Sequence, residues 1–211
     1  MSSILTNNGA IVALQTLKSI NSSLNKAQSE ISTGKSINGA QDNSAIWAIS
    51  KVMETDQAAF KTIQSSLNVA QATVSTAVSG AEQVTGLLKE MKNLAANAGT
   101  DGFDFAKVQT DIAAKMAQIG SIVSGTQMNG VNLLSTNGIG GGATFTTLAS
   151  LDRQVGTATT TANTIVVNSV DFEANIVGGT LTTITDSATA ATAVNDLETL
   201  LEVSINGAAA L

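Results

Sequence analysis

Apolar residues recur at helical spacing over most of the first 130 residues. In the longest series, positions three and four residues apart run from Ile46 to Ala98, and fifteen of the sixteen are apolar. An apolar content of 43% would give about seven. The series predicts one continuous helix of about 80 Å with a coiled-coil-like apolar face. The alternative is a long bundle helix without a special role, but the length favours an elongated molecule.

Three further helices are expected, over residues 4–31, 104–124 and 186–205. The first carries Ile4, Ile11, Leu14, Leu17, Ile20, Leu24, Ala27 and Ile31 on one face. It should stop at Gly34, because glycine is common just past a helix end. Asp104, and Asp186 or Ser187, are the expected N-caps of the other two helices. Asn206-Gly207 is interpreted as the end of the last helix.

Between the third and the last helix the pattern changes to short β-branched runs. These runs are ATFTTLA at 143–149, NTIVVNSV at 163–170 and GTLTTIT at 179–185. They predict a small β-rich insertion, with Gly178-Gly179 forming a hairpin turn between the second and third runs. The predicted fold is therefore mainly α, an elongated rod of long coiled-coil-like helices with a small β-hairpin or strand insertion.

Composition narrows the possible chemistry. The chain has no His, Cys, Tyr or Pro. It therefore cannot build the usual zinc site, a Ser-His-Asp triad or a cysteine nucleophile. We expect no enzymatic activity, no catalytic residue, no cofactor and no bound metal.

Charge is distributed unevenly along the chain. Residues 1–130 carry nine Lys and nine acidic residues, whereas residues 131–211 carry Arg153 and seven acidic residues, which accounts for the net charge of −6. No basic patch is available for nucleic acid, and no apolar run is long enough to span a bilayer. The first residues lack the basic start and cleavage pattern of a signal peptide. We expect neither nucleic-acid binding nor membrane insertion.

Three kinds of short segment invite a chemical interpretation. Gly34-Lys35-Ser36 resembles part of a phosphate-binding loop, but Ser29 stands where that loop needs its first glycine. The glycine run at 138–142 lacks the following helix that would present backbone N–H groups to a phosphate. The acidic pairs Asp101/Asp104 and Asp171/Glu173 have no metal-loop spacing, so we expect them to be solvated.

The long apolar series is the candidate functional feature. Residues 62–81 carry no charge, although exposed helix faces usually carry Lys and Glu. An uncharged face suits packing against identical copies, and the alternative is an ordinary surface of low charge. The residues expected to pack between helices or subunits are Ile46, Ile49, Met53, Phe60, Ile63, Leu67, Val74, Val84, Leu88 and Met91.

Two segments carry a resemblance to a known family. Residues 30–53 read EISTGKSINGAQDNSAIWAISKVM, and residues 127–134 read QMNGVNLL. The first resembles the signature segment of bacterial flagellins, and the second is similar to the turn that closes their second rod helix. The resemblance covers about residues 1–135 and extends, with less specificity, to residues 186–205.

This resemblance implies a structural subunit of the bacterial flagellar filament. It implies an inner-tube helix and linker at 1–42, a rod domain at 43–138, a β-rich surface domain at 139–185 and a returning rod helix at 186–211. The implied partners are copies of the chain itself, a flagellar export chaperone and cap or hook-junction proteins. The implied location is extracellular, reached by type III export. A cell-surface protein recognising carbohydrate or a host surface is the alternative.

Two departures from the family pattern carry expectations. Flagellins normally continue for several dozen residues after the last predicted helix. We therefore expect either a truncated form or an atypical homologue, in which the helix at 4–31 lacks its own-chain partner. Residues 88–94 read LKEMKNL, where flagellins detected by the vertebrate Toll-like receptor for flagellin have Leu-x-Arg-Val-x-Glu-Leu. Leu88 and Leu94 match, whereas Glu90 and Asn93 do not, so we expect weak or absent receptor activation.

Overall fold

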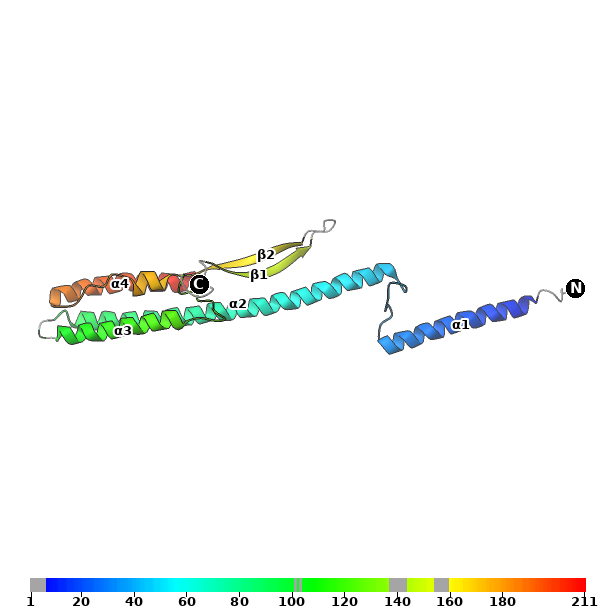
Figure 1. Cartoon of the computed structure of the whole chain (residues 1–211), viewed down its shortest axis with the longest axis horizontal. Helices are drawn as coiled ribbons and strands as arrows, with labels where there is room; N and C mark the ends of the chain where they lie inside the picture. Colours follow the sequence, from blue (N-terminus) through cyan, green and yellow to red (C-terminus); the bar gives the residue numbers. More distant parts are fainter. Residues whose placement is uncertain (1–6, 101, 103, 137–143, 154–159) are drawn as a thin grey trace. The chain divides into compact units, whose positions relative to one another are not determined.

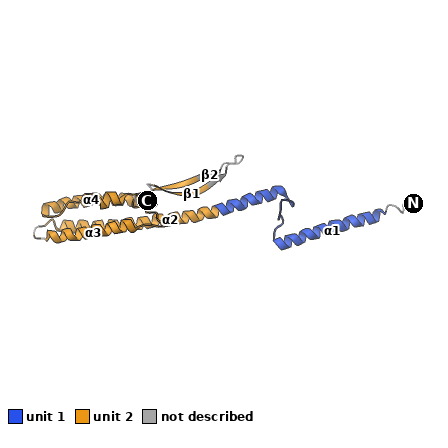
Figure 2. Cartoon of the chain, viewed as in Figure 1, with its two compact units in different colours: residues 1–59 blue, residues 60–211 orange. Residues whose placement is uncertain are grey.

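The computed structural model describes residues 7–100, 102, 104–136, 144–153 and 160–211. Its elements are α1 (Asn8–Thr33), α2 (Ser44–Asn97), α3 (Phe105–Gly125), β1 (Thr144–Arg153), β2 (Thr160–Asn168), the single π-helical turn η1 (Glu173–Val177) and α4 (Ser187–Ala210) (Figure 1). The mainly α fold with long helices and a small antiparallel sheet is thereby confirmed. The chain divides into a first unit, residues 1–59, and a second unit, residues 60–211 (Figure 2).

The first unit contains α1, a loop at 34–43 and the start of α2. The Asn7 side chain caps α1 by accepting the Ala10 N–H, and Gly34 ends the helix with a φ of 65°, which confirms the predicted stop. Asp42 Oδ2 accepts the N–H groups of Asn38 at 3.0 Å and Gly39 at 3.2 Å. These two bonds hold the pKa of the Asp42 carboxyl below its usual value.

The second unit has a core made by three helices that lie side by side (Figure 1). The fully buried large side chains come from α2, α3, α4 and the segments between them: Val84, Leu88, Met91, Ile112, Ile119, Val123, Leu134, Phe172, Ile176 and Leu197. The predicted N-caps are confirmed. Asp104 accepts the Lys107 N–H, and Asp186 forms a capping box with Thr189.

The β-structure is smaller than predicted. β1 and β2 form a two-stranded antiparallel hairpin with an irregularity between Leu148 and Ser150. Two predictions here were wrong, the third strand at 179–185 and the hairpin turn at Gly178-Gly179. The chain after β2 does not form a strand, because it turns back into the core. The N–H of Phe172 donates to the Leu134 carbonyl, and Phe172, Ile176 and Ile184 are buried there.

The prediction that Asn206-Gly207 ends the last helix was also wrong. α4 continues to Ala210, and Gly207 is buried inside it. A Cβ at position 207 would overlap the Phe172 ring and approach Val170 Cγ1 to 2.7 Å. Glycine stands here because the Phe172 ring needs the space, so its role is packing rather than helix termination.

Candidate self-association surface

The apolar face of α1 is uncovered in the first unit. None of its residues is buried, and Ile11, Leu14, Leu17, Ile20, Leu24 and Ile31 are all exposed. A shallow groove of about 550 Å³ is lined by Ile11, Leu14, Leu17 and the polar residues beside them. Exposed apolar patches of this kind mark surfaces where proteins associate.

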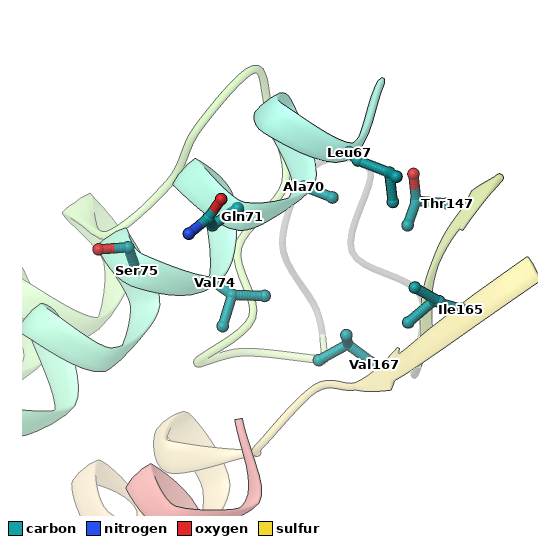
Figure 3. Close-up of a pocket in the computed structure, with 8 residues that line it drawn as sticks. All are labelled: Leu67, Ala70, Gln71, Val74, Ser75, Thr147, Ile165 and Val167. Carbon is teal, nitrogen blue, oxygen red and sulfur yellow. The ribbon is translucent and has the colours of Figure 1, made fainter. Parts of the chain in front are cut away.

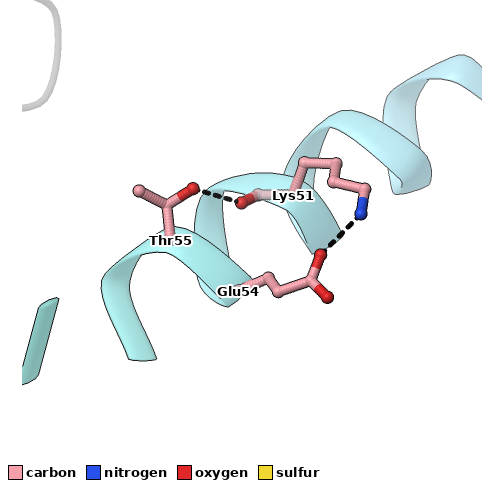
Figure 4. A network of polar contacts seen from close by, with 3 residues as sticks. All are labelled: Lys51, Glu54 and Thr55. Carbon is pink, nitrogen blue, oxygen red and sulfur yellow. Dashed lines mark hydrogen bonds and ion pairs between the residues drawn. The ribbon is translucent and has the colours of Figure 1, made fainter. Parts of the chain in front are cut away.

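The start of α2 has the same character. Of the predicted packing residues in this part, Ile46, Ile49 and Met53 are exposed, Met53 by 66%. Beside them Lys51 Nζ pairs with Glu54 Oε2 at 2.6 Å, and the Thr55 hydroxyl donates to the Lys51 carbonyl at 2.9 Å (Figure 4). The Lys51 ammonium lowers the pKa of the Glu54 carboxyl. Because both partners are exposed, the pair contributes little to stability.

The remaining packing residues lie in the second unit. Phe60 is 58% exposed, Ile63 is buried, and Leu67 and Val74 are half-buried. Val84, Leu88 and Met91 are fully buried in the core. The single apolar series therefore divides into a part that its own chain covers and a part that remains open.

A groove of about 460 Å³ lies between α2 and the hairpin (Figure 3). α2 contributes Leu67, Ala70, Gln71, Val74 and Ser75, and the strands contribute Thr147, Ile165 and Val167. No lining residue is charged. The strand residues were not among the predicted packing residues, although Ile165 and Val167 alternate in the way that places both on one face of the hairpin.

The receptor-like segment has both buried and exposed side chains. Leu88 is buried, Leu94 is half-buried, and Glu90 and Asn93 are exposed. Glu90 Oε2 of α2 forms an ion pair with Lys115 Nζ of α3 at 2.5 Å. The nearby Lys92 of α2 forms an ion pair with Glu198 of α4. Glu90 therefore bridges two helices as well as facing solvent.

Polar contacts between distant segments were not found by sequence reasoning. The Thr85 and Ser204 hydroxyls share a hydrogen bond of 2.8 Å between α2 and α4. The buried Asn132 side chain donates to the Val123 carbonyl and accepts the Leu134 N–H. Apolar periodicity carries no signal for such contacts, because it does not indicate which polar residues face a neighbouring helix.

The acidic pair Asp171/Glu173 makes hydrogen bonds to other side chains of the chain. Asp171 accepts the Thr136 hydroxyl at 2.9 Å, and Glu173 accepts the Ser135 hydroxyl at 2.5 Å, so these carboxylates fasten the segment before the hairpin to the segment after it. Asp101 and the glycine run at 138–142 lie outside the described residues.

Ligand-binding features are few. Within the described ranges, no group of three or more Asp and Glu side chains could hold a metal ion. The carbohydrate alternative gains no support, since Phe172 is buried and Phe145 of β1 is half-buried. Among the described helices, none is long and apolar enough to cross a membrane.

Comparison with known proteins agrees with this geometry. The sequence model of the bacterial flagellin N-terminal helical region matches residues 4–138. Flagellin A of Rhizobium meliloti is 35% identical over 175 residues, which cover 83% of this chain and 43% of that protein. The chain thus spans less than half the length of this relative. Flagellin FljM of Caulobacter vibrioides is 31% identical, and the match covers 100% of this chain and 74% of FljM.

A solved structure shares the fold. The crystal structure of Bacillus cereus flagellin superposes with a TM-score of 0.56 at 21% identity, covering 67% of this chain and 77% of that one. The family match extends over more than half of the chain, and the FljM match over all of it. This chain belongs to the bacterial flagellin family.

Proposed function

We propose that this chain is a structural subunit of the bacterial flagellar filament and that it associates with copies of itself through its long helices. The observation that carries the proposal is the uncovered apolar face of α1 in a member of the flagellin family. Full burial of one Leu or Ile side chain contributes roughly 1.5–3 kcal/mol. A row of six such residues therefore provides a strong drive for association.

The packing residues divide between two roles in this proposal. Ile46, Ile49, Met53 and Phe60 contact neighbouring copies, because they are exposed in the single chain. Val84, Leu88 and Met91 hold the subunit itself together. The residues half-buried beside the hairpin, Leu67 and Val74, lie between these two sets.

Location and further partners follow from the same proposal. The subunit is exported by the flagellar type III route, contacts an export chaperone and the cap or hook-junction proteins on the way, and remains outside the cell. It supports motility and needs no catalytic site. Mass spectrometry of filaments sheared from cells should find the chain, and its recovery only inside the cells would contradict this location.

Electron microscopy of the protein produced from its whole gene, under assembly-promoting salt, tests the function. Leu17→Asp places a charge on the apolar face of α1, and Ser19→Asp places the same charge about 160° away around the helix. We expect filaments from the unmodified protein and from Ser19→Asp, and discrete particles from Leu17→Asp. Discrete particles from all three proteins would contradict the filament function.

A further inference from the structure

The tetrapeptide Ile-Asn-Gly-Ala occurs twice in this chain, at residues 37–40 and 205–208. The first copy lies in the loop between α1 and α2, and the second lies within α4. An Asn-Gly pair is chemically labile because the glycine nitrogen can attack the neighbouring side-chain amide without obstruction by a Cβ. Since the two copies are identical, a difference in their reactivity has to come from the structure around them.

We propose that Asn38 is a site of spontaneous deamidation in the folded protein and that Asn206 is protected from it. In this reaction the Gly39 nitrogen bonds to Asn38 Cγ, the Cγ–Nδ2 bond breaks, and the departing group takes up the Gly39 proton and leaves as ammonia. Water then opens the cyclic imide at either carbonyl. The net change converts asparagine and water into aspartate or isoaspartate and ammonia, with no oxidation.

The loop copy has the freedom that this reaction requires. Asn38 is exposed and lies outside any helix or strand, so helical or strand hydrogen bonds do not fix its ψ. The hydrogen bonds of Asn38 and Gly39 are made with Asp42, and when they open the backbone can rotate to bring Cγ toward the next nitrogen. In α4 the backbone is held near the helical ψ of about −42°, which keeps these two atoms apart. Gly207 is also buried against Phe172 and Val170, so ring closure there requires α4 to open.

The other described Asn-Gly pairs are also held by backbone structure. Asn8-Gly9 is in the first turn of α1. Asn129-Gly130 forms a tight turn closed by two backbone hydrogen bonds between Met128 and Val131, of 3.0 and 2.9 Å. Of the described pairs, Asn38-Gly39 alone lies outside a helix and outside the two central positions of a hydrogen-bonded turn; Gly39 is the first residue of a turn that the Asp42 N–H closes by donating to the Gly39 carbonyl at 3.2 Å.

Asp42 sets how fast the loop copy reacts. Its carboxylate accepts hydrogen bonds from the N–H groups of Asn38 and Gly39. The Gly39 nitrogen is the atom that has to lose its proton in the reaction. The hydrogen bond occupies the nucleophile, and the negative charge disfavours deprotonation next to it. Asp42 is therefore a positioning residue that slows the reaction, and its removal should accelerate it.

The reaction changes the loop that carries it. A new carboxylate at position 38 lies beside Asp42 and repels it, and isoaspartate adds a methylene to the backbone. Both products disturb the arrangement in which Asp42 accepts two successive N–H groups. Deamidation therefore loosens the joint between α1 and α2 as the protein ages.

Peptide mass mapping of the dispersed protein, aged in heavy-oxygen water at mildly alkaline pH, tests the proposal without requiring assembly. Because each 1.4 kcal/mol of opening free energy slows the reaction about tenfold, we expect Asn38 to react at least about ten times faster than Asn206. In denaturant the two rates should converge. Equal rates in the folded protein, or faster reaction at Asn206, would overturn the proposal.

Two variants separate the chemistry from unfolding. A Cβ at Gly39 would meet no atom closer than Gln41 N at 3.9 Å, so Gly39→Ala should keep the fold and its circular dichroism spectrum while it suppresses reaction at Asn38. Asp42→Ala should increase the Asn38 rate and leave Asn206 unchanged. If the Asn38 rate is the same in Gly39→Ala as in the unmodified protein, ring closure is refuted. If the Asn38 rate falls or stays constant in Asp42→Ala, the role of Asp42 is refuted.

Discussion

α1 and α4 have similar lengths and opposite environments. α1 has 26 residues and none is buried, whereas α4 has 24 residues and seven are buried. Both carry apolar residues at helical spacing. The comparison teaches that periodicity predicts a helix with an apolar face, but the partner that covers the face depends on the rest of the chain or on other molecules.

The largest difference between these helices should be in unfolding free energy. Leu197 of α4 is fully buried, and Leu17 of α1 is 59% exposed. Leu197→Ala should lower the stability of the second unit by about 2–5 kcal/mol, because it leaves a cavity. Leu17→Ala should change it by no more than about 0.5 kcal/mol. Urea unfolding followed by circular dichroism measures both, and equal losses would contradict the division into covered and uncovered helices.

Glycine substitutions provide a second comparison of packed and open positions. Gly207→Ala should destabilise the second unit by about 1–3 kcal/mol, because the methyl group would overlap the Phe172 ring. At Gly86 of α2 a Cβ would meet nothing within 4 Å, so Gly86→Ala should stabilise the unit by up to about 1 kcal/mol. Thermal unfolding of both variants gives the signs of the two stability changes. If Gly207→Ala leaves the Tm unchanged, the Phe172 ring does not pack tightly against position 207.

Two acidic residues give a smaller, pH-dependent comparison. Hydrogen bonds from Thr189 lower the pKa of Asp186, and those from Asn38 and Gly39 lower the pKa of Asp42. A lowered folded pKa stabilises the protein above the ordinary value of about 4, and this contribution is lost as the pH falls through the folded value.

Replacement of either carboxyl should therefore affect stability above about pH 4, and the effect should fade in acid. Asp186→Ala should lower the Tm of the second unit at neutral pH, and the difference from the unmodified protein should shrink in acid. Asp42→Ala should leave this Tm unchanged, because Asp42 lies in the first unit. A Tm difference for Asp186→Ala that grows toward acid would show that the sign is wrong.

The smallest response is expected from the vertebrate receptor. Glu90 and Asn93 are exposed, and Glu90 is paired with Lys115, so a negative charge lies where the receptor-detected pattern has arginine. Reporter cells treated with nanomolar protein should show little or no signal. Strong signalling would mean that these two positions do not control recognition in this chain.

The helices could be predicted because their signals are local. The Gly34 stop and the Asp104 and Asp186 caps involve residues no more than four positions apart. Burial along α2 could not be predicted, because Met53 and Met91 belong to the same periodic series and only the second is buried in the core of the second unit. Gly207 was misinterpreted for the same reason, since the Phe172 ring that explains it lies 35 positions earlier in the chain.

Hydrogen exchange of the dispersed and the assembled protein tests the central claim most directly. In the dispersed protein, the α1 amides should exchange much faster than those of the buried side of α4, because α1 has no buried face. On assembly α1 and the start of α2 should gain protection, while the protection of α4 should change little. An α1 that is already protected when dispersed, or that stays unprotected after assembly, would contradict the claim that copies of the chain cover its apolar face.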